Sequence, residues 1–421
     1  MARTLPPPVR VYRVGGSVRD ELLGCDAGDR DFVVVGATPA IMLAAGYMPV
    51  GKDFPVFLHP VTRDEYALAR TERKSGRGYR GFNFHATPEV TLDEDLRRRD
   101  LTINAMERAD DGTLIDPWGG EADLRAGVLR HVSPAFAEDP LRVLRVARFA
   151  ARFAFRIAPS TMTLMRRIVA AGELATLAPE RVWQELARGL CEAHPSRMLA
   201  ALRRCGALHA LVPEVDALYE PSGRGAVTQG GAGQRVEHAL DLAAGAGLPL
   251  AARYAVLAQR IAGAGRPGRG PGTAIPARSA VARADAISRR LKVPVECRDA
   301  ARLLARWQHA LAGAKDLAPA QLLDLLSGVD ALRRPERLET LLAASHILSV
   351  AAHRGDRSGD AAVHVRGALG VIRNVDAASI AREARADAGV SGAGHDAIPK
   401  ALRAARIAAL RQWLRGDGQI R

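Results

Sequence analysis

Residues 14–36, VGGSVRDELLGCDAGDRDFVVVG, hold the stretch that decides the fold of the N-terminal part of the chain. A β-rich run ends in two glycines, a helix start follows, and an apolar strand comes directly after the DRD triplet. Strand residues i and i+2 share a face, so Asp29 and Asp31 project together. Two carboxylates this close repel each other unless divalent cations compensate, and a pair of such ions can activate an attacking hydroxyl group. The alternative is a loop with two solvated carboxylates.

The two glycines upstream suit an anionic ligand. Gly16 has no Cβ atom, so backbone N–H groups can approach a triphosphate, and a helix N-terminus favours anions. Arg19 on that helix could form paired hydrogen bonds to two phosphate oxygens. A Gly–Gly pair alone is more often a tight turn, but its short distance from the DRD triplet fits nucleotidyl transfer.

The pattern of the chain changes near residue 138. Before it, short β-rich runs alternate with loops and one helical segment, which predicts an α/β domain; the runs are 9–16, 31–36, 55–60 and 65–70, and the helix is 38–47. After it, amphipathic helices follow one another, beginning with 140–155, 160–174, 179–193 and 195–208. More helices are expected over 277–415, with flexible or loose stretches at 222–233, 262–276 and 386–397.

Composition narrows the class of protein. No apolar run is long enough to span a membrane and the N-terminus has no apolar signal core, so a cytosolic location is expected. Four scattered cysteines, which form no CxxC pair, agree with a reducing compartment. A net charge of +14 and a pI near 10.4 favour a polyanionic partner such as nucleic acid, although a high-GC genome also enriches arginine.

Four ordered motifs together resemble a class II CCA-adding enzyme, of the bacterial tRNA nucleotidyltransferase and poly(A) polymerase family: VGGSVRDELLG (14–24), DRDFVVVG (29–36), RRRDLTINAM (97–106) and EDPLRVLRVARFAARF (138–153). The resemblance is dense from residue 11 to about residue 220 and then fades. It implies an α/β nucleotidyltransferase head of the polymerase-β-like type, followed by an all-α neck, body and tail. The implied domains are a head over 1–137, a neck with a nucleotide-selecting helix over 138–221, and a tRNA-binding body and tail over 222–421.

The resemblance implies roles for the acids and glycines of the head. Asp29 and Asp31 correspond to the family's catalytic ligands for Mg²⁺. Glu65 lies where a third acidic group could help, or it is a plain strand-end glutamate. Gly16 and Arg19 correspond to contacts with the triphosphate.

Further nucleotide contacts follow from the third and fourth motifs. Arg99 and Asp100 match the residues that position the nucleotide sugar and phosphates, the alternative being a solvated basic run. Asn104 either contacts the nucleotide or caps a helix that starts there. Arg145 and Arg148 continue a basic stripe and are candidate nucleotide ligands; otherwise they form an exposed face whose stems cover apolar surface.

Asp139 and Arg142 are the candidates for selecting the base of the incoming nucleotide. They are three residues apart and therefore neighbours on one helical face. A carboxylate accepts hydrogen bonds and a guanidinium donates them, which matches the donor beside an acceptor that cytosine and adenine present. Uracil and guanine present the reverse order, so the pair can select C and A without a template. The alternative is that Asp139 only caps the helix, with a proline in its first turn.

The segment 69–84, ARTERKSGRGYRGFNF, is basic, Gly-rich and expected to be mobile. Family members that add all three nucleotides keep a flexible loop here, which assists the change from C to A addition. A generic charged loop is the alternative.

The C-terminal part departs from many relatives, which carry an HD phosphohydrolase domain. His238 fits the first metal ligand, but Gln259 and Arg260 replace the His–Asp dipeptide, and Gln308, beside His309, stands at a further ligand position. An arginine has the wrong charge for a metal ligand. We therefore expect this region to lack phosphohydrolase activity and to serve as a tRNA-binding body or a structural tail.

The sequence thus predicts addition of CCA to tRNA 3′ ends from CTP and ATP, with Mg²⁺. A bacterial poly(A) polymerase is the nearest enzymatic alternative, because it shares the head and similar motifs. An RNA-binding protein with an inactive head is the alternative from another class.

Overall fold

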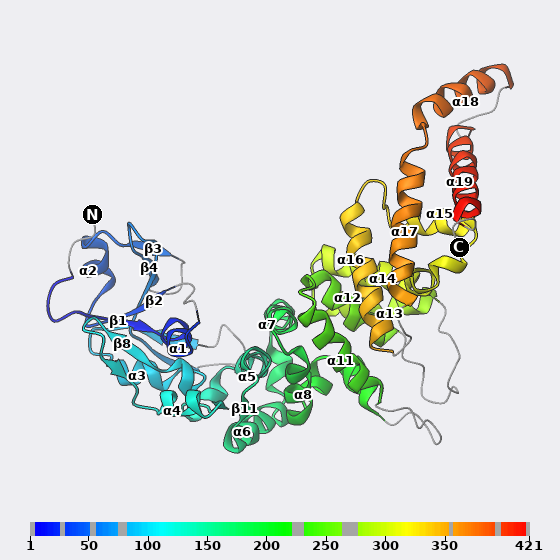
Figure 1. Cartoon of the computed structure of the whole chain (residues 1–421). Coiled ribbons are helices and arrows are strands. Elements are labelled where there is room, and N and C mark those ends of the chain that lie inside the picture. Colours follow the sequence, from blue (N-terminus) through cyan, green and yellow to red (C-terminus); the bar gives the residue numbers. More distant parts are fainter. Residues whose placement is uncertain are drawn as a thin grey trace. The chain divides into compact units, whose positions relative to one another are not determined.

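The computed structural model describes residues 5–25, 30–50, 56–74, 82–220, 231–262, 277–352, 357–391 and 397–417. The chain divides into two compact units, Met1–Asp216 and Ala217–Arg421 (Figure 1). The first unit combines a sheet with helices, whereas the described elements of the second are helical. This order agrees with an α/β head followed by helices.

Seven strands of the first unit form one sheet; in spatial order they are β3 (Met48–Val50), β4 (Val56–Leu58), β5 (Glu65–Leu68), β2 (Asp31–Val35), β1 (Arg10–Val14), β8 (Glu107–Ala109) and β9 (Leu114–Ile115). Strands β2 and β5 pair in parallel, and the other neighbours in this sheet are antiparallel. The four strands expected from sequence are confirmed as β1, β2, β4 and β5.

The register of the strands aligns acidic residues in one row across the sheet. Asp31 is the partner of Glu65 on β5 and of Val14 on β1, and Val14 is in turn the partner of Glu107 on β8. Residues directly opposite each other on neighbouring strands project from the same face. The row therefore presents three carboxylates on one side of the sheet.

Apolar side chains cover both faces of the sheet. On one face, Val34 and Leu68 pack with Met42 of α2 (Pro39–Ala44), the helix expected over 38–47. Thr38 caps α2 by accepting a hydrogen bond from the Ile41 backbone N–H, and Pro39 occupies its first turn. On the face of the acidic row, Val14 and Val33 pack with residues that include Leu92, the first residue of α3.

Several head elements were not among those expected from the sequence. Helix α3 (Leu92–Arg97) begins with a capping box between Thr91 and Glu94. It is followed by the 3₁₀ turn η2 (Thr102–Asn104) and by α4 (Gly120–Arg125). Figure 1 shows α3 and α4 on the side of the sheet away from α2.

The segment 69–84 was expected to be a mobile loop, and this is partly wrong. Strands β6 (Thr71–Lys74) and β7 (Phe82–His85) pair antiparallel within it. Residues 75–81 lie outside the described residues. The alternation that predicts a hairpin is hidden by the high content of arginine and glycine.

Helices form the rest of the first unit: α5 (Leu141–Phe153), α6 (Pro159–Ala170), α7 (Pro179–Cys191), α8 (Pro195–Cys205), α9 (Ala207–Leu211) and α10 (Pro213–Asp216). The four helices expected here are confirmed, and three of them start with proline in the first turn. Helix α5 ends at Phe153, and the next residue, Ala154, has a left-handed backbone conformation with φ 57°. A two-residue strand, β11 (Arg156–Ile157), pairs with β10 (Val128–Leu129), so this region is not purely helical.

The described elements of the second unit include a short 3₁₀ turn, η5 (Ala217–Tyr219), and the helices α11 (Ala232–Gly245), α12 (Leu250–Ala262), α13 (Ala277–Arg290), α14 (Val295–Ala312), α15 (Pro319–Gly328), α16 (Pro335–Val350), α17 (Arg357–Arg373), α18 (Ala377–Ser391) and α19 (Ala397–Asp417). The expected loose stretch at 386–397 is wrong in part, because α18 continues to Ser391. The Gly/Pro-rich stretches lie largely outside the described residues, although α11 already begins at Ala232. Across the described residues, every helix is too short or too polar to cross a membrane.

Candidate functional site

The acidic row provides one side of the candidate site. Asp31 opens β2 and Glu65 opens β5, and both are exposed and in register. Asp29, the other expected metal ligand, lies outside the described residues. Carboxylate oxygens are the donors that hard divalent cations such as Mg²⁺ prefer. The paired, exposed positions of Asp31 and Glu65 therefore fit a divalent cation.

The glycine turn between β1 and α1 (Gly16–Leu22) requires glycine at its first position. Gly15 has φ 67°, a conformation that residues with a Cβ atom rarely adopt, and an added Cβ would lie 3.0 Å from Arg99 Nη1. Gly16 is the first residue of α1. The turn thus brings the backbone of Gly15 and the guanidinium of Arg99 together.

Arg19 lies on α1, which follows this turn, and is buried, with 3% of the residue exposed. Its Nε donates to Asp20 Oδ1 at 2.9 Å, and its Nη1 donates to the side-chain oxygen of Asn104. Its guanidinium also lies 5.3 Å from the ring centre of Phe149 and 4.9 Å from that of Phe153 on α5. The expected triphosphate contact is therefore held by a carboxylate, an amide and two aromatic rings.

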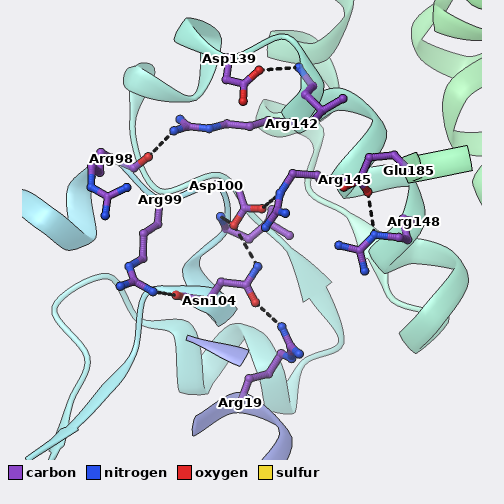
Figure 2. Close-up of polar contacts among 12 residues, drawn as sticks. Arg19, Arg98, Arg99, Asp100, Asn104, Asp139, Arg142, Arg145, Arg148 and Glu185 are labelled. Atoms are coloured by element: carbon purple, nitrogen blue, oxygen red, sulfur yellow. Dashed lines mark hydrogen bonds and ion pairs between the residues drawn. The ribbon is translucent and has the colours of Figure 1, made fainter. Parts of the chain in front are cut away.

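Asp100 is the centre of the polar cluster in Figure 2. Its Oδ1 accepts hydrogen bonds from the Leu101 backbone N–H and from Asn104 Nδ2, both at 2.9 Å. Its Oδ2 accepts from Arg145 Nε at 2.7 Å. Burial acts to raise the pKa of Asp100, but Arg145 and the Asn104 hydrogen bond outweigh it and hold this pKa well below its usual range. Asp100 is therefore an ionised carboxylate at neutral pH.

Asn104 connects Asp100 to Arg19, because its amide donates to the first and its oxygen accepts from the second. The alternative that Asn104 caps a helix starting there is wrong, since it is the last residue of η2. Its buried side chain orders the two charged groups on either side of it.

Arg99 reaches the site from the end of α3. Its Nη1 donates to the Asn104 backbone carbonyl at 3.3 Å, and its Nη2 lies 3.2 Å from Asp95 Oδ2 and 3.7 Å from Glu107 Oε1. Asp95 is fully buried and also accepts from Arg98. Arg99 is thus a partly buried guanidinium held by Asp95 and by the Asn104 carbonyl, not a residue of a solvated basic run.

Asp139 and Arg142 lie at the start of α5. Asp139 Oδ1 accepts from the backbone N–H of Leu141, the first residue of α5, at 3.0 Å, while its Oδ2 is 3.2 Å from Arg181 Nη2; the N-cap position itself is Pro140 and not Asp139. Arg142 is buried and donates from Nη1 to the Ala135 carbonyl at 2.8 Å and from Nη2 to the Arg98 carbonyl. These bonds fix the direction of both side chains.

Arg145 and Arg148 leave α5 toward different partners (Figure 2). Arg148 is buried, its Nε donates to Glu185 Oε2 on α7 at 2.7 Å, and its Nη1 lies 3.7 Å from Glu192 Oε1. The alternative of an exposed face is therefore wrong for Arg148. The structure places Arg145 at the Asp100 cluster and Arg148 in the packing between α5 and α7.

Sequence reasoning missed three acids of this region, Asp95, Glu107 and Glu185. Asp95 had a detectable signal, because acid–arginine spacings of three and four residues to Arg98 and Arg99 are typical of helical ion pairs. Glu107 and Glu185 find their partners only through the tertiary fold.

The positions that correspond to HD metal ligands lie on helices of the second unit. His238 and His309 are exposed, on α11 and α14. Gln259 Oε1 on α12 and Gln308 Oε1 on α14 are buried and have no hydrogen-bond partner. Among the residues that the structure describes, no group of three or more His, Cys, Asp or Glu side chains is placed to hold a metal ion.

The chain is similar to known proteins over nearly its whole length. Residues 11–130 match the family described as poly A polymerase head domain, and residues 154–219 match the probable RNA and SrmB-binding site of polymerase A. A protein of Bordetella pertussis named CCA-adding enzyme is 50% identical over 414 residues, covering 97% of this chain and 99% of that protein. The chain belongs to the CCA-adding enzyme family. The expected family is thus confirmed.

Other relatives and solved structures agree with this membership. A protein of Chromobacterium violaceum named Multifunctional CCA protein is 50% identical, covering 96% of this chain and 98% of the relative. The fold is similar to that of the Bacillus stearothermophilus CCA-adding enzyme in complex with CTP, with a TM-score of 0.62, 22% identity, and coverage of 98% and 94% of the two chains. A CCA-adding enzyme in complex with ATP has a TM-score of 0.65 at 22% identity, covering 96% of this chain and 86% of the other. The polymerase-β-like head with a mostly helical remainder, characteristic of the family, is confirmed for this chain.

Proposed function

We propose that this member of the family adds CCA to the 3′ ends of tRNA from CTP and ATP, releasing pyrophosphate, in tRNA maturation and repair. The observation that carries the proposal is identity of about 50% over nearly the full length to proteins named for CCA addition. The reaction is a nucleotidyl transfer: the tRNA 3′-hydroxyl loses its proton and bonds to the α-phosphorus, and the bond to pyrophosphate breaks. Because tRNA is the substrate, the cytoplasm is the compartment we propose.

The acids at the mouth of β2 are the proposed metal ligands. Divalent ions, proposed to be Mg²⁺, would be held by Asp31 together with Asp29 and would supply activation of the hydroxyl group and stabilisation of the leaving oxygen. Glu65 is the candidate third carboxylate in this proposal, which its exposure and its register with Asp31 support. Asp31 is in register with Val14, the residue before Gly15, so the proposed metal site and the glycine turn lie at the same end of strands β1 and β2.

The phosphates and sugar of the nucleotide are proposed to bind between the glycine turn and the Asp100 cluster. Gly16 keeps the turn accessible to phosphates, and positive charge comes from Arg99, whose guanidinium lies near Gly15, and from Arg19, whose guanidinium lies near Gly16. Asp100, held by Asn104 and by Arg145, positions the basic groups that surround the sugar. Most hydrogen bonds of this network are already formed without substrate. Fewer side chains therefore have to be ordered when the nucleotide binds, which lowers the entropy cost of binding.

Base choice is proposed to come from Asp139 and Arg142. Their donor and acceptor atoms match the exposed edges of cytosine and adenine, and the hydrogen bonds to backbone carbonyls hold Arg142 in one direction. In this proposal Arg148 acts indirectly: its ion pair with Glu185 holds α5, the helix that carries Arg142, against α7.

The remaining regions complete the proposed domains. We propose the head over 1–137, the neck over 138–221 and a tRNA-binding body and tail over 222–421, whose arginines suit contacts to backbone phosphates. Glutamine at positions 259 and 308, each with a buried amide oxygen, supports a body without HD phosphohydrolase activity.

The test is incorporation into a tRNA that lacks its 3′-terminal CCA, with each nucleoside triphosphate supplied alone and then CTP and ATP together. The proposal expects C, C and A to be added and extension to stop. Long tails from ATP alone would instead indicate a poly(A) polymerase. Binding of tRNA without any incorporation would indicate an RNA-binding protein with an inactive head.

A further inference from the structure

Glu107 lies on the same face of the head sheet as the proposed metal ligand Asp31. Its partner on β1 is Val14, and the partner of Val14 on β2 is Asp31. With neighbouring strands about 4.8 Å apart, the Cα atoms of Glu107 and Asp31 are separated by about 10 Å. Glu107 therefore faces the reaction side of the sheet without touching the metal ligands.

The carboxylate of Glu107 is buried and unsatisfied. None of the side chain is exposed, and neither oxygen has a hydrogen-bond partner. Its nearest cationic group is Arg99, whose Nη2 lies 3.7 Å from Oε1, too far for a good hydrogen bond. Arg99 is instead held by Asp95 at 3.2 Å and by the Asn104 carbonyl.

The groups around Glu107 explain why it forms no hydrogen bond with Arg99. Helix α3 contributes Asp95 and, beyond its last turn, Arg98, while Arg99 follows in the chain. Strands β1 and β9 contribute only Val14 and Ile115 opposite it. Burial, opposed by Arg99 and reinforced by Asp95, raises the pKa of Glu107 to about 8. A buried acid with no donor and one acidic neighbour is thus mostly protonated at neutral pH.

We propose that Glu107 is a positioning residue for nucleotide binding: protonated, it leaves the charge of Arg99 to the phosphates of the incoming nucleotide, and ionised, it competes with them. This inference rests on the proposed function, in which Arg99 contacts the nucleotide. A triphosphate bound beside Arg99 adds negative charge near Glu107 and so favours its protonated form further.

This proposal predicts the direction in which CTP affinity changes with pH, because protonation of Glu107 and nucleotide binding are thermodynamically linked. If bound nucleotide raises the pKa of Glu107 by about half a unit to one unit, CTP affinity falls by about three- to ten-fold once the pH exceeds both pKa values. Binding near pH 8 is accompanied by uptake of a fraction of a proton. A side chain with a purely structural role would change neither quantity.

The experiment measures KM for CTP and kcat of the full chain on tRNA lacking CCA, from pH 7 to pH 9.5. The variant is Glu107→Gln, which keeps size and removes the ionisable group, and the control is Asp93→Asn, which removes an exposed carboxylate from α3. The wild type and the control are expected to show KM rising by about three- to ten-fold across this range, and Glu107→Gln to show a flat KM with the same pH dependence of kcat. An equal rise of KM in Glu107→Gln, or a flat KM in the wild type, would overturn the inference.

A second measurement needs neither turnover nor a folded variant. Calorimetry of CTP binding to the wild type at pH 8, in buffers of different ionisation enthalpy, is expected to show proton uptake. Absence of uptake rejects the role of Glu107. Failure of the wild type to incorporate CMP at any pH rejects the proposed function instead, while the calorimetry still decides the question of Glu107.

Discussion

Arg145 Nε lies 2.7 Å from Asp100 Oδ2, so a charged hydrogen bond joins helix α5 to the RRRDLTINAM motif. The Asp100 side chain is 6% exposed and that of Arg145 is 34% exposed. Through Asn104 the same carboxylate is connected to Arg19 on α1. Residues 19, 100, 104 and 145 are therefore one polar cluster, although they come from three separate motifs.

Removing Asp100 should destabilise the chain in a pH-dependent way. Asp100→Asn is expected to lower the free energy of unfolding by about 2 kcal/mol at pH 7, because Arg145 loses a charged partner. The pKa of Asp100 is lowered in the folded state, so its contribution is present above the unfolded value of about 3.9 and declines as pH falls below it. The difference between wild type and Asp100→Asn in chemical denaturation should thus shrink below about pH 4. A difference that is constant with pH would contradict this, and Asp93→Asn is the matched control.

Glu107 should have the opposite pH signature. Its folded pKa, about 8, is raised above the unfolded value, so its favourable contribution is present at low pH and is lost as pH rises through about 8. Glu107→Gln should therefore become steadily more stable relative to wild type between about pH 4.3 and pH 8, and level off above that. Thermal unfolding of both proteins across this range is the measurement. If the stabilities of the two proteins changed with pH in parallel, the pKa of Glu107 would not be raised in the folded state.

Substitution of Arg142 should change the selection of the base more than it changes the rate of nucleotidyl transfer. Arg142→Ala is expected to increase incorporation of UMP relative to CMP by about ten-fold, with a smaller loss of the CMP rate, because the guanidinium donors that favour cytosine are removed. Arg166→Ala is the control, since Arg166 on α6 also donates to a carbonyl, that of Arg204. Unchanged discrimination against UTP and GTP in a folded Arg142→Ala variant would reject the templating role.

The second unit should be inactive as a phosphohydrolase. The purified full chain is expected not to hydrolyse 2′,3′-cyclic nucleotides with added Ni²⁺, Mn²⁺ or Mg²⁺, because Gln259 and Gln308 offer weak neutral ligands where charged or imidazole donors are needed. Metal-stimulated hydrolysis by the chain, abolished by His238→Ala, would contradict this.

The sequence predicted the elements that depend on local pattern. Alternation identified β1 and β2, and proline at the first turn with 3.6-residue periodicity identified α6 to α8. It did not predict β8, a three-residue strand with two charged or polar positions, although β8 places Glu107 in the acidic row. Short strands of this kind are defined by their neighbours in the sheet and not by their own residues.

The same limit applies to the site. Motif matching selected Asp100, Asn104 and Arg145, and the structure brings these three together. It also selected Arg148, whose partner Glu185 lies 37 residues away on another helix and carries no signal in the sequence. Burial and ion pairing between distant residues were the parts that only the fold could supply.

The central claim is that the acids at the mouth of β2 form the reaction centre of a metal-dependent transferase. The most direct measurement compares single-turnover CMP incorporation and tRNA affinity in the wild type, Asp31→Asn, and Asp110→Asn, an exposed control in the β8–β9 turn. We predict that Asp31→Asn loses incorporation by about a hundredfold or more, while its tRNA affinity stays within about two-fold of that of the wild type and of Asp110→Asn. Incorporation by Asp31→Asn at the wild-type rate would contradict the account.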